Sequence, residues 1–391
     1  MESSEKIKDV IIIGGGLVGG LLAQTLSYHK FDVAVVDIED PQALLSSRED
    51  HRSYALSQGT KHIFDAVGLW DGLKDKSTPI EIIKVATSVE GPFLTYNYQE
   101  VGDEPLGYLI NATQLRRHIL TSNLTATEWI APQKVDTIET HDSHVSVCLE
   151  GGQTLTARLA IGADGNNSWC RKALNIPTFE RPYTHKALVF NVTHQEPHHN
   201  QAFEIFTPEG PFAMLPYPDN TSGCVWFLEA DKADAMRDLS EDDFNKTLNR
   251  RFKNLLGALN LAGPLNAYPL NLKIPHTPVA PRFALVGDAA HTLHPVAGQG
   301  VNLGFRDVDI LTKLLVEARE LGLDIGSVTT LSQYRNKRLL DVGSMMFFTD
   351  TMARMFNHNF TFLHKLGSHG LRILDRLPFV KRPLIRHAMG I

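Results

Sequence analysis

The N-terminal segment carries the clearest hydrophobic pattern of the chain. Residues 9–13 (DVIII) form a short apolar run, as expected of a parallel strand that is buried on both faces. Apolar residues then recur with helical spacing at Leu21, Leu22 and Leu26, and residues 31–36 form a second apolar run. This order predicts a strand, a helix and a second parallel strand, which together make one βαβ unit.

The rest of the chain alternates between strand-like and helix-like patterns. Strands are predicted within residues 80–98, 157–162, 188–192, 223–228 and 283–286. Helices are predicted at residues 57–67, 113–120 and 233–256, and again in the segment that contains Val301, Phe305, Val308, Leu311 and Leu315. Because residues 80–98 alternate as antiparallel strands do, the strand-rich middle of the chain is expected to form a second domain inserted into the first.

Length and composition set limits on the class of protein. A chain of 391 residues with 43% hydrophobic and 21% charged residues is typical of a soluble protein of two domains, or of one domain with an insertion. The net charge of −6 argues against a nucleic-acid-binding protein. The cysteines Cys148, Cys170 and Cys224 lie far apart, which fits a reducing compartment and no disulfide framework. No apolar run is long enough to span a membrane, and we expect a cytoplasmic protein.

Glycines occupy the turn between the first strand and the first helix. Gly14, Gly16 and Gly19 have the spacing of a dinucleotide-binding turn. Gly14 allows the tight turn, Gly16 lets a pyrophosphate approach the backbone, and Gly19 lets the helix pack closely on the strand. The helix start offers unpaired N–H groups to phosphate. Asp37, at the end of the second strand, is placed to bind ribose hydroxyls, so the unit predicts dinucleotide binding.

A second glycine-rich stretch, residues 287–304 (GDAAHTLHPVAGQGVNLG), follows the last predicted strand. Gly287 clears space, and Asp288 presents a carboxylate that suits a ligand hydroxyl. Gly298 and Gly300 lead into a helix whose N-terminal amides and positive dipole end point toward whatever the glycines admit. Without the other motifs, a simple turn with a helix cap is the alternative explanation of this stretch.

The two histidines of this stretch raise the question of a metal site. His291 and His294 are three residues apart, but the stretch lacks the HExxH pattern, and no third ligand of fitting type lies nearby. We therefore expect no metal here. His291 is expected to order the turn by hydrogen bonding.

The order of these motifs resembles the single-component FAD aromatic hydroxylases, and most closely the ubiquinone-biosynthesis hydroxylases (the UbiH/UbiF/VisC group). The resemblance covers essentially the whole chain. Besides the glycine motifs it rests on Asp50-x-Arg52, Gly107-Tyr108, Asp164-Gly165-x-x-Ser168-x-x-Arg171 and Tyr334-x-x-x-Arg338. One departure is visible, since Asn111-Ala112 stands where the group often has a Glu-Asn pair.

The resemblance implies an α/β fold. A Rossmann-like FAD-binding domain of the glutathione-reductase and p-hydroxybenzoate-hydroxylase type would carry an inserted, mainly antiparallel substrate domain, with helices at the C-terminus. The FAD-binding domain is expected to be discontinuous, at residues 1–78, 106–180 and 270–345. The substrate domain would take residues 79–105 and 181–269, and the C-terminal helical segment residues 346–391.

The resemblance also implies a set of cofactor-binding residues. The expected contacts to FAD are Gly14, Gly16, Leu17, Val18, Gly19, Asp37, Arg52, Asp164, Gly287, Asp288, Pro295, Gly298, Gln299, Gly300, Val301 and Asn302. No catalytic base is evident. Tyr217, the phenol of the segment 210–218 (GPFAMLPYP), is the candidate catalytic residue, and a plain position at the edge of a core strand is its alternative.

The implied reaction is hydroxylation of a phenol ring. NAD(P)H, or a separate reductase, would reduce FAD, and O2 would then form the flavin C4a-hydroperoxide that the ring attacks. The implied substrate is a polyprenylated phenol or benzoquinol of ubiquinone biosynthesis. The alternatives are a prenyl-chain reductase or small-aromatic hydroxylase on the same fold, and a non-catalytic flavoprotein subunit of a biosynthetic complex.

The C-terminal segment is basic in an otherwise acidic chain. Residues 365–391 carry Lys365, Arg372, Arg376, Lys381, Arg382 and Arg386 against a single acid, Asp375. A basic amphipathic end can rest on anionic lipid, which would place the protein peripherally at the inner face of a membrane, near a lipophilic substrate. Helices packed on the core with a solvated basic face are the alternative.

Overall fold

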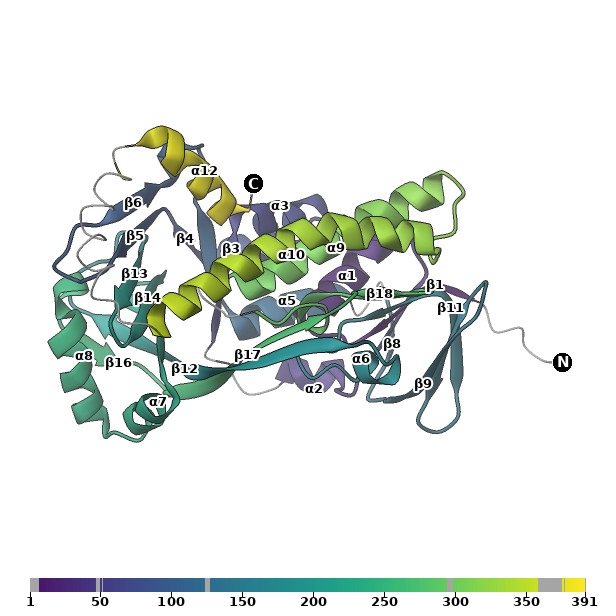
Figure 1. Ribbon diagram of the computed structural model, residues 1–391, viewed down its shortest axis with the longest axis horizontal. Helices are drawn as coiled ribbons and strands as arrows, with labels where there is room; N and C mark the ends of the chain where they lie inside the picture. Colours follow the sequence, from purple (N-terminus) through teal and green to yellow (C-terminus); the bar gives the residue numbers. More distant parts are fainter. Residues whose placement is uncertain are drawn as a thin grey trace.

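The computed structural model describes residues 7–46, 50, 52–123, 127–293, 298–357, 375 and 377–390. The molecule is elongated, with a mainly parallel sheet toward one end and an antiparallel sheet toward the other (Figure 1). This is the predicted α/β fold with both types of sheet and C-terminal helices.

The parallel strands form the first sheet. In spatial order they are β19 (Phe283–Leu285), β11 (Thr154–Gly162), β1 (Lys8–Ile13), β2 (Val33–Val36) and β8 (Glu128–Ile130). The strands β18 (Val279–Ala280), β9 (Val135–Thr140) and β10 (Val145–Leu149) extend it in antiparallel pairing.

Alternate residues of β1 face two different apolar layers. Val10 and Ile12 pack with α1 (Leu17–Tyr28), α3 (Gln58–Ala66), α5 (Ala112–Asn123), α9 (Gln299–Glu320) and α10 (Val328–Asn357). Ile11 and Ile13 pack with β9, β10 and α6 (Trp169–Ala173). Because both faces are covered, the strand is apolar throughout, as its sequence indicated.

The second sheet is antiparallel except for one pair. Its order is β16 (Leu259–Leu261), β12 (Thr178–His194), β15 (Thr221–Glu229), β14 (Gly210–Tyr217), β13 (Gln201–Thr207), β5 (Ile82–Ala86) and β6 (Leu94–Asn97), with β17 (Asn266–Pro275) beside β12. Only β13 and β5 run parallel. Residues 79–105 thus contribute β5 and β6 to the sheet that residues 181–269 otherwise build.

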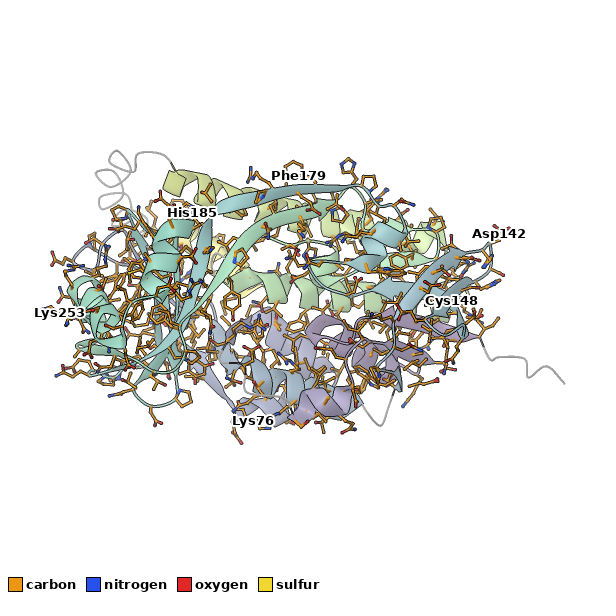
Figure 2. All side chains as sticks on the ribbon, turned by 90° about the horizontal axis from the view of Figure 1, so that it is seen from below. Lys76, Asp142, Cys148, Phe179, His185 and Lys253 are labelled. Carbon is orange, nitrogen blue, oxygen red and sulfur yellow. The ribbon has the colours of Figure 1, made fainter. Side chains whose placement is uncertain are left out.

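Two long strands connect the two ends of the molecule. The boundaries expected at residues 180/181 and 269/270 fall inside β12 and β17, which pair from Thr178 to Val189 with one irregularity. Figure 2 shows Phe179 on the connecting part of β12, whereas His185 lies where this strand enters the antiparallel sheet. The division into domains stays a prediction, and the chain passes between the two parts through continuous strands.

A third, small sheet lies between the other two. It consists of β3 (Ser53–Ser57), β7 (Gly107–Asn111) and β4 (Ser77–Ile80), all antiparallel. The short helices of the N-terminal third of the chain are α2 (Pro41–Ser46), α4 (Asp71–Lys74) and the 3-10 turn η1 (Tyr98–Glu100).

The single helix predicted at residues 233–256 is wrong, because two helices occupy that region. They are α7 (Ala230–Arg237) and α8 (Glu241–Leu256). The side-chain oxygen of Ser240 accepts a hydrogen bond from the N–H of Asp243 at 3.2 Å and caps α8, whose first turn is acidic. A capped N-terminus with acidic residues fixes a helix start at this point.

At the C-terminal end, α10 lies alongside α9, and α12 (Pro378–Met389) packs near β6 (Figure 1). The helix α10 continues across the boundary expected at residue 346. None of the helices in the described part of the chain is long and apolar enough to span a membrane.

Candidate functional site

Three sequence motifs meet at the carboxyl ends of three neighbouring parallel strands, β1, β11 and β19. The first motif is the glycine turn from Gly14 to Gly19, the second runs from Asp164 to Arg171, and the third is the stretch 287–304. The N–H of Ala163, after β11, donates to the carbonyl of Ile13, and the N–H of Val286 donates to the carbonyl of Gly162. The carboxyl edge is where open parallel sheets bind their ligands. Motifs that lie more than a hundred residues apart in sequence therefore form one site.

The glycines after β1 behave as their spacing predicts. Gly14 has a φ of +102°, and a β-carbon at Gly19 would lie 1.9 Å from the carbonyl oxygen of Gly14. Gly19 is thus required by close packing of α1 on the turn. A β-carbon at Gly16 would meet no protein atom within 4 Å. Gly16 is exposed, so the space beside its backbone is open to a ligand.

Asp37 stands at the end of β2, directly beside this turn. One of its carboxylate oxygens accepts the N–H of Gly15 at 2.5 Å, and the other accepts the N–H of Glu39 at 2.8 Å. These bonds fix the carboxylate next to the glycine turn. Because each oxygen has a further lone pair, Asp37 can still accept a hydrogen bond from a ligand hydroxyl.

The second motif joins β11 to the third motif. Asp164 accepts the N–H of Cys170 at 2.9 Å with one oxygen, while its other oxygen is buried and has no hydrogen-bond partner in the described structure. The guanidinium of Arg171 is buried and donates to the carbonyls of Asp288 and Ala289 at 3.1 and 2.7 Å. Arg171 therefore positions the Asp288 turn, a role that its sequence context did not reveal.

In the third motif, Asp288 points away from the core. The residue is exposed to solvent, yet the surrounding protein atoms raise the pKa of its carboxyl by desolvation. The helix α9 begins nearby at Gly298, which has a φ of +64° and provides no side-chain cap. Its first N–H groups are therefore left to other partners.

A buried ionic network holds this turn against α9 and α10. The carboxylate of Asp307 is completely buried and accepts hydrogen bonds from the N–H of Gly287 (2.7 Å), the Nε of Arg338 (2.5 Å) and His291 Nε2 (2.7 Å). These donors hold the pKa of Asp307 below its usual value in spite of its burial. His291 thus orders the turn, as predicted.

Asn302 has a structural task. It is fully buried; its side-chain oxygen accepts from Ser57 and Thr60, and its side-chain nitrogen donates to the carbonyls of Ala55 and Gly298. Because these hydrogen bonds occupy the side chain, only the backbone of Asn302 is left to contact a ligand. Val18 likewise packs against Gly287 and Gly304. Pro295 and His294 lie outside the described residues.

Arg52 connects the small sheet with the long strand β17. It makes a two-pronged ion pair with Asp50, and its guanidinium lies 5.7 Å from the ring centre of Tyr268. Burial raises the pKa of neighbouring Tyr54, which also interacts electrostatically with Arg52 and Asp288. Arg52 is therefore on the side of the small sheet that faces the Asp288 turn.

Asn111, at the position where the chain departs from the Glu-Asn pair of the group, has a structural role. The side-chain oxygen of Asn111 accepts the N–H of Thr113 at 2.9 Å, at the start of α5. The side-chain nitrogen of Asn111 donates to the carbonyl of Asp50 at 3.2 Å. Asn111 thus fixes the segment that carries Arg52.

Tyr217 ends β14 where the antiparallel sheet meets the small sheet. Its ring packs in a cluster with Ala55, Leu109 and Leu215. Burial raises the pKa of its phenol, and hydrogen bonding with the side chains of Ser53 and Asn111 offsets only part of this effect. A raised pKa keeps the phenol protonated at neutral pH, so Tyr217 is suited to donate a hydrogen bond rather than to act as a base.

These residues fit an adenine dinucleotide. Two helices, α1 and α9, begin at exposed glycines without side-chain caps, which leaves N–H groups for anionic or carbonyl oxygens. Three carboxylates, Asp37, Asp164 and Asp288, lie at the ends of neighbouring strands and can accept hydrogen bonds from hydroxyls. Among the residues that the structure describes, no group of acidic, histidine and cysteine side chains forms a metal site.

Comparison with known proteins identifies this type of site. The family model described as "FAD binding domain" matches residues 8–347. The chain belongs to this FAD-binding family. FAD is its cofactor, as the motifs implied.

Full-length relatives narrow the family further. The chain is 40% identical over 390 residues to a protein named ubiquinone hydroxylase UbiL from Rhodospirillum rubrum, covering 99% of this chain and 91% of the relative. It is 31% identical to 3-demethoxyubiquinol 3-hydroxylase of Escherichia coli, covering 98% of both. Among solved structures, p-nitrophenol 4-monooxygenase from Pseudomonas putida has the same fold, with a TM-score of 0.81, 19% identity and 99% of both chains covered.

These comparisons confirm the predicted class, an FAD-dependent monooxygenase of the ubiquinone-hydroxylase group. The predicted contacts of individual residues with FAD stay predictions.

Proposed function

We propose that this protein hydroxylates the aromatic ring of a polyprenylated phenol or benzoquinol on the pathway to ubiquinone. The observation that carries the proposal is full-length similarity to two hydroxylases whose names place them in that pathway. The site supports it as well, because the FAD-binding turns lie beside the small sheet, on which the apolar cluster around Leu215 and Tyr217 packs. A lipophilic ring requires such apolar surface.

We propose the following roles for the site residues. The glycine turn at Gly14, Gly16 and Gly19 and the start of α1 would hold the pyrophosphate, with Asp37 on the ribose. Asp288 would hold the ribityl chain, and the first amides of α9 would face the pyrimidine edge of the flavin. These amides stabilise negative charge there without rearrangement.

The chemistry that bound FAD supplies is activation of O2 after reduction by NAD(P)H or a separate reductase. The task of the chain itself is to position the ring and to exclude water.

A labelling experiment tests the proposed function. The FAD-loaded protein is given a short-chain analogue of a demethylated ubiquinol, NADH or NADPH, and heavy-isotope O2. We expect a product that has gained one oxygen atom from O2, detected by mass spectrometry. A photochemically reduced sample replaces NAD(P)H if a separate reductase is the donor.

The outcomes separate the alternatives. A prenyl-chain reductase would add hydrogen without oxygen from O2, and a small-aromatic hydroxylase would act on rings that lack the alkyl tail. A non-catalytic subunit would bind FAD and yield no product with any donor. Each of these results would contradict the proposal.

We further propose that α12 contacts an anionic membrane surface. Lys381 of the basic C-terminal segment is not available to lipid, because it is buried and pairs with Glu100 at 2.8 Å and Asp375 at 3.0 Å. Arg382 and Arg386 are exposed and line a surface pocket with Phe379, which is 72% exposed. Exposed basic and aromatic residues on one helix suit a lipid headgroup surface.

Charge reversal on α12 tests this contact. The double variant Arg382→Glu, Arg386→Glu is expected to bind vesicles of anionic phospholipid at least about thirtyfold more weakly, because each of the two lost basic residues contributes about 1 kcal/mol near such a surface. Sedimentation with vesicles measures binding. The control is Lys253→Glu on the exposed side of α8, which should leave binding unchanged. Equal binding of the double variant and the wild type would rule out α12 as the contact.

A further inference from the structure

The antiparallel sheet has two very different faces. On the central strands β13, β14 and β15, Phe203, Phe212 and Trp226 belong to the buried cluster that packs under α8. The opposite face carries the large residues Leu215 and Phe227 as well as several small ones. We call the group made of Glu204 and the small residues near it in the register the small-residue face: Val85, Ala202, Glu204, Ala213, Gly223 and Val225.

The small-residue face is incompletely covered. Val85 and Val225 lie on inner strands of the sheet and are nevertheless only partly buried. Apolar residues at the centre of a sheet are normally covered, and small side chains leave room above them. The face therefore presents partly exposed apolar surface at Val85 and Val225.

This face borders the cofactor side of the molecule. Its residue Ala202 packs in one cluster with Leu215 and Tyr217 of β14 and with Ala55 of the small sheet. A β-carbon at Gly298, where α9 begins, would lie 3.6 Å from the side chain of Ala55. The small-residue face thus continues toward the turn that opens α9.

Glu204 is the ionisable residue of this face. In the sheet register it lies between Ala213 on β14 and Val85 on β5, neither of which can pair with it. Its Oε1 is buried without a hydrogen-bond partner in the described structure. Burial with no compensating charge raises the pKa of Glu204 to about 7. An unpaired buried carboxyl oxygen costs stability unless a ligand supplies a donor.

In the described structure, the strands β5, β6 and β14 around Glu204 carry the titratable groups Lys84, Tyr96 and Tyr217. The helix α12, which packs on Ile83 of β5, carries Lys381, Arg382 and Arg386. Lys84 on β5 pairs with Phe203 and lies on the opposite face, with its ammonium group 5.8 Å from the ring centre of Phe203. On neighbouring strands, Tyr96 of β6 and Tyr217 of β14 are phenols whose pKa is raised by burial, so both are neutral near pH 7. The titration of Glu204 is therefore separate from that of the tyrosines.

We propose that Glu204 accepts the hydrogen bond and then the proton of a ring hydroxyl of the aromatic substrate. The proton moves from the hydroxyl oxygen to Oε1 of Glu204, and the electron pair of the broken O–H bond stays on the ring oxygen. The substrate becomes a phenolate, which is the more electron-rich ring, and the carboxylate becomes a neutral carboxylic acid. This inference rests on the proposed function, because it takes a hydroxylated ring as the substrate.

Ligand binding to the FAD-loaded protein tests the proposal without turnover. The probes are a short-chain 4-alkylphenol and its methyl ether, which lacks the donor, measured by calorimetry between pH 5.5 and 8.5. Wild type should prefer the phenol, and the preference should grow as the pH rises through about 7, where Glu204 becomes ionised. At pH 8, Glu204→Gln should reduce this preference about tenfold or more, as expected for one hydrogen bond to a charged acceptor, and remove its pH dependence.

Two controls accompany this variant. Glu196→Gln, at an exposed position outside the sheet, should behave as wild type. At pH 8, Glu204→Gln should unfold at a temperature no lower than wild type, because the change removes an unpaired buried charge and keeps the side-chain shape.

The results distinguish this inference from the proposed function. If Glu204→Gln keeps the preference and its pH profile, Glu204 is not the acceptor and the inference is wrong. If wild type binds neither probe, both proposals fail. If the preference behaves as expected and no oxygen enters any product, the proposed function alone fails.

Discussion

Replacing Asp307 by alanine is expected to lower the free energy of unfolding by about 3–5 kcal/mol, the usual result of removing one partner from a buried ion pair. Asp307 is completely buried and holds Arg338, His291 and the N–H of Gly287 at 2.5–2.7 Å. Without it, Asp341 is the remaining ionic partner of the Arg338 guanidinium among the residues that the structure describes. Denaturant unfolding of the FAD-free protein measures the change.

The pH dependence of the same difference is a second test. Since the pKa of Asp307 is lower in the folded protein than its usual value, its contribution is present above about pH 4 and is lost as the pH falls through the folded-state value. The stability difference between wild type and Asp307→Ala should therefore shrink in acid.

Asp309→Ala is the matched control for Asp307→Ala. Asp309 is on the same helix, and its ion pair with Lys313 lies at the surface. An exposed pair contributes about 0.5 kcal/mol or less. Asp307→Ala should also release FAD more easily, because the Gly287–Asp288 turn loses its anchor. Equal stability of the two variants would show that the network contributes nothing to the fold.

The cofactor motifs were readable from sequence because each is local. The turn from Gly14 to Gly19 depends on backbone geometry within one βαβ unit. The structure shows the predicted tight turn, with a positive φ at Gly14, and the predicted close packing at Gly19. The position of Asp37 could be predicted because this residue ends the second strand of the same βαβ unit. What the sequence could not supply was the way that the motifs join each other, such as the bonds from Arg171 to the carbonyls of Asp288 and Ala289.

The network around Asp307 was missed, although a signal for it exists. Asp307 lies four residues from Leu303 and Leu311, on the buried side of α9. A carboxylate at such a position must be paired, so its presence predicts a cationic partner. Choosing Arg338 as that partner requires knowing that α10 packs on α9, and this is a tertiary fact. The resemblance supplied Arg338 as a motif residue without its role.

Glu204 and the break before α8 were missed for different reasons. In β13, Glu204 lies in sequence between the apolar residues Phe203 and Ile205 and on the opposite face of the sheet. The strand alone does not reveal whether a neighbouring strand provides a partner for its carboxyl group. Only the register, with Ala213 and Val85 on either side, shows that none does. The break at Ser240 was legible, because serine followed three residues later by an acidic residue is a common helix start. The helical spacing on both sides concealed it.

Replacing Gly16 by alanine is expected to weaken FAD binding about a hundredfold while leaving the FAD-free protein as stable as wild type. A β-carbon at Gly16 would meet no protein atom within 4 Å, so the fold tolerates it. The added methyl group would occupy the space through which a pyrophosphate approaches the N–H groups at the start of α1. Losing two hydrogen bonds to a charged group of this kind accounts for the expected factor. Fluorescence titration with FAD and denaturant unfolding measure the two quantities separately.

Two further glycines make this test specific. Gly19→Ala would place a β-carbon 1.9 Å from a backbone oxygen, so it should lower stability by about 1–3 kcal/mol before any ligand is added. Gly343→Ala in α10 meets no atom within 4 Å and is not one of the predicted FAD contacts, so it should bind FAD normally and be slightly more stable. If Gly16→Ala bound FAD as tightly as Gly343→Ala, the pyrophosphate would not lie against this turn. If Gly16→Ala instead unfolded as readily as Gly19→Ala, protein packing would require glycine at both positions. The glycines of the turn would then be no evidence for a ligand. Because the two glycines differ in what surrounds them, the three variants separate the requirement of the fold from the requirement of the cofactor.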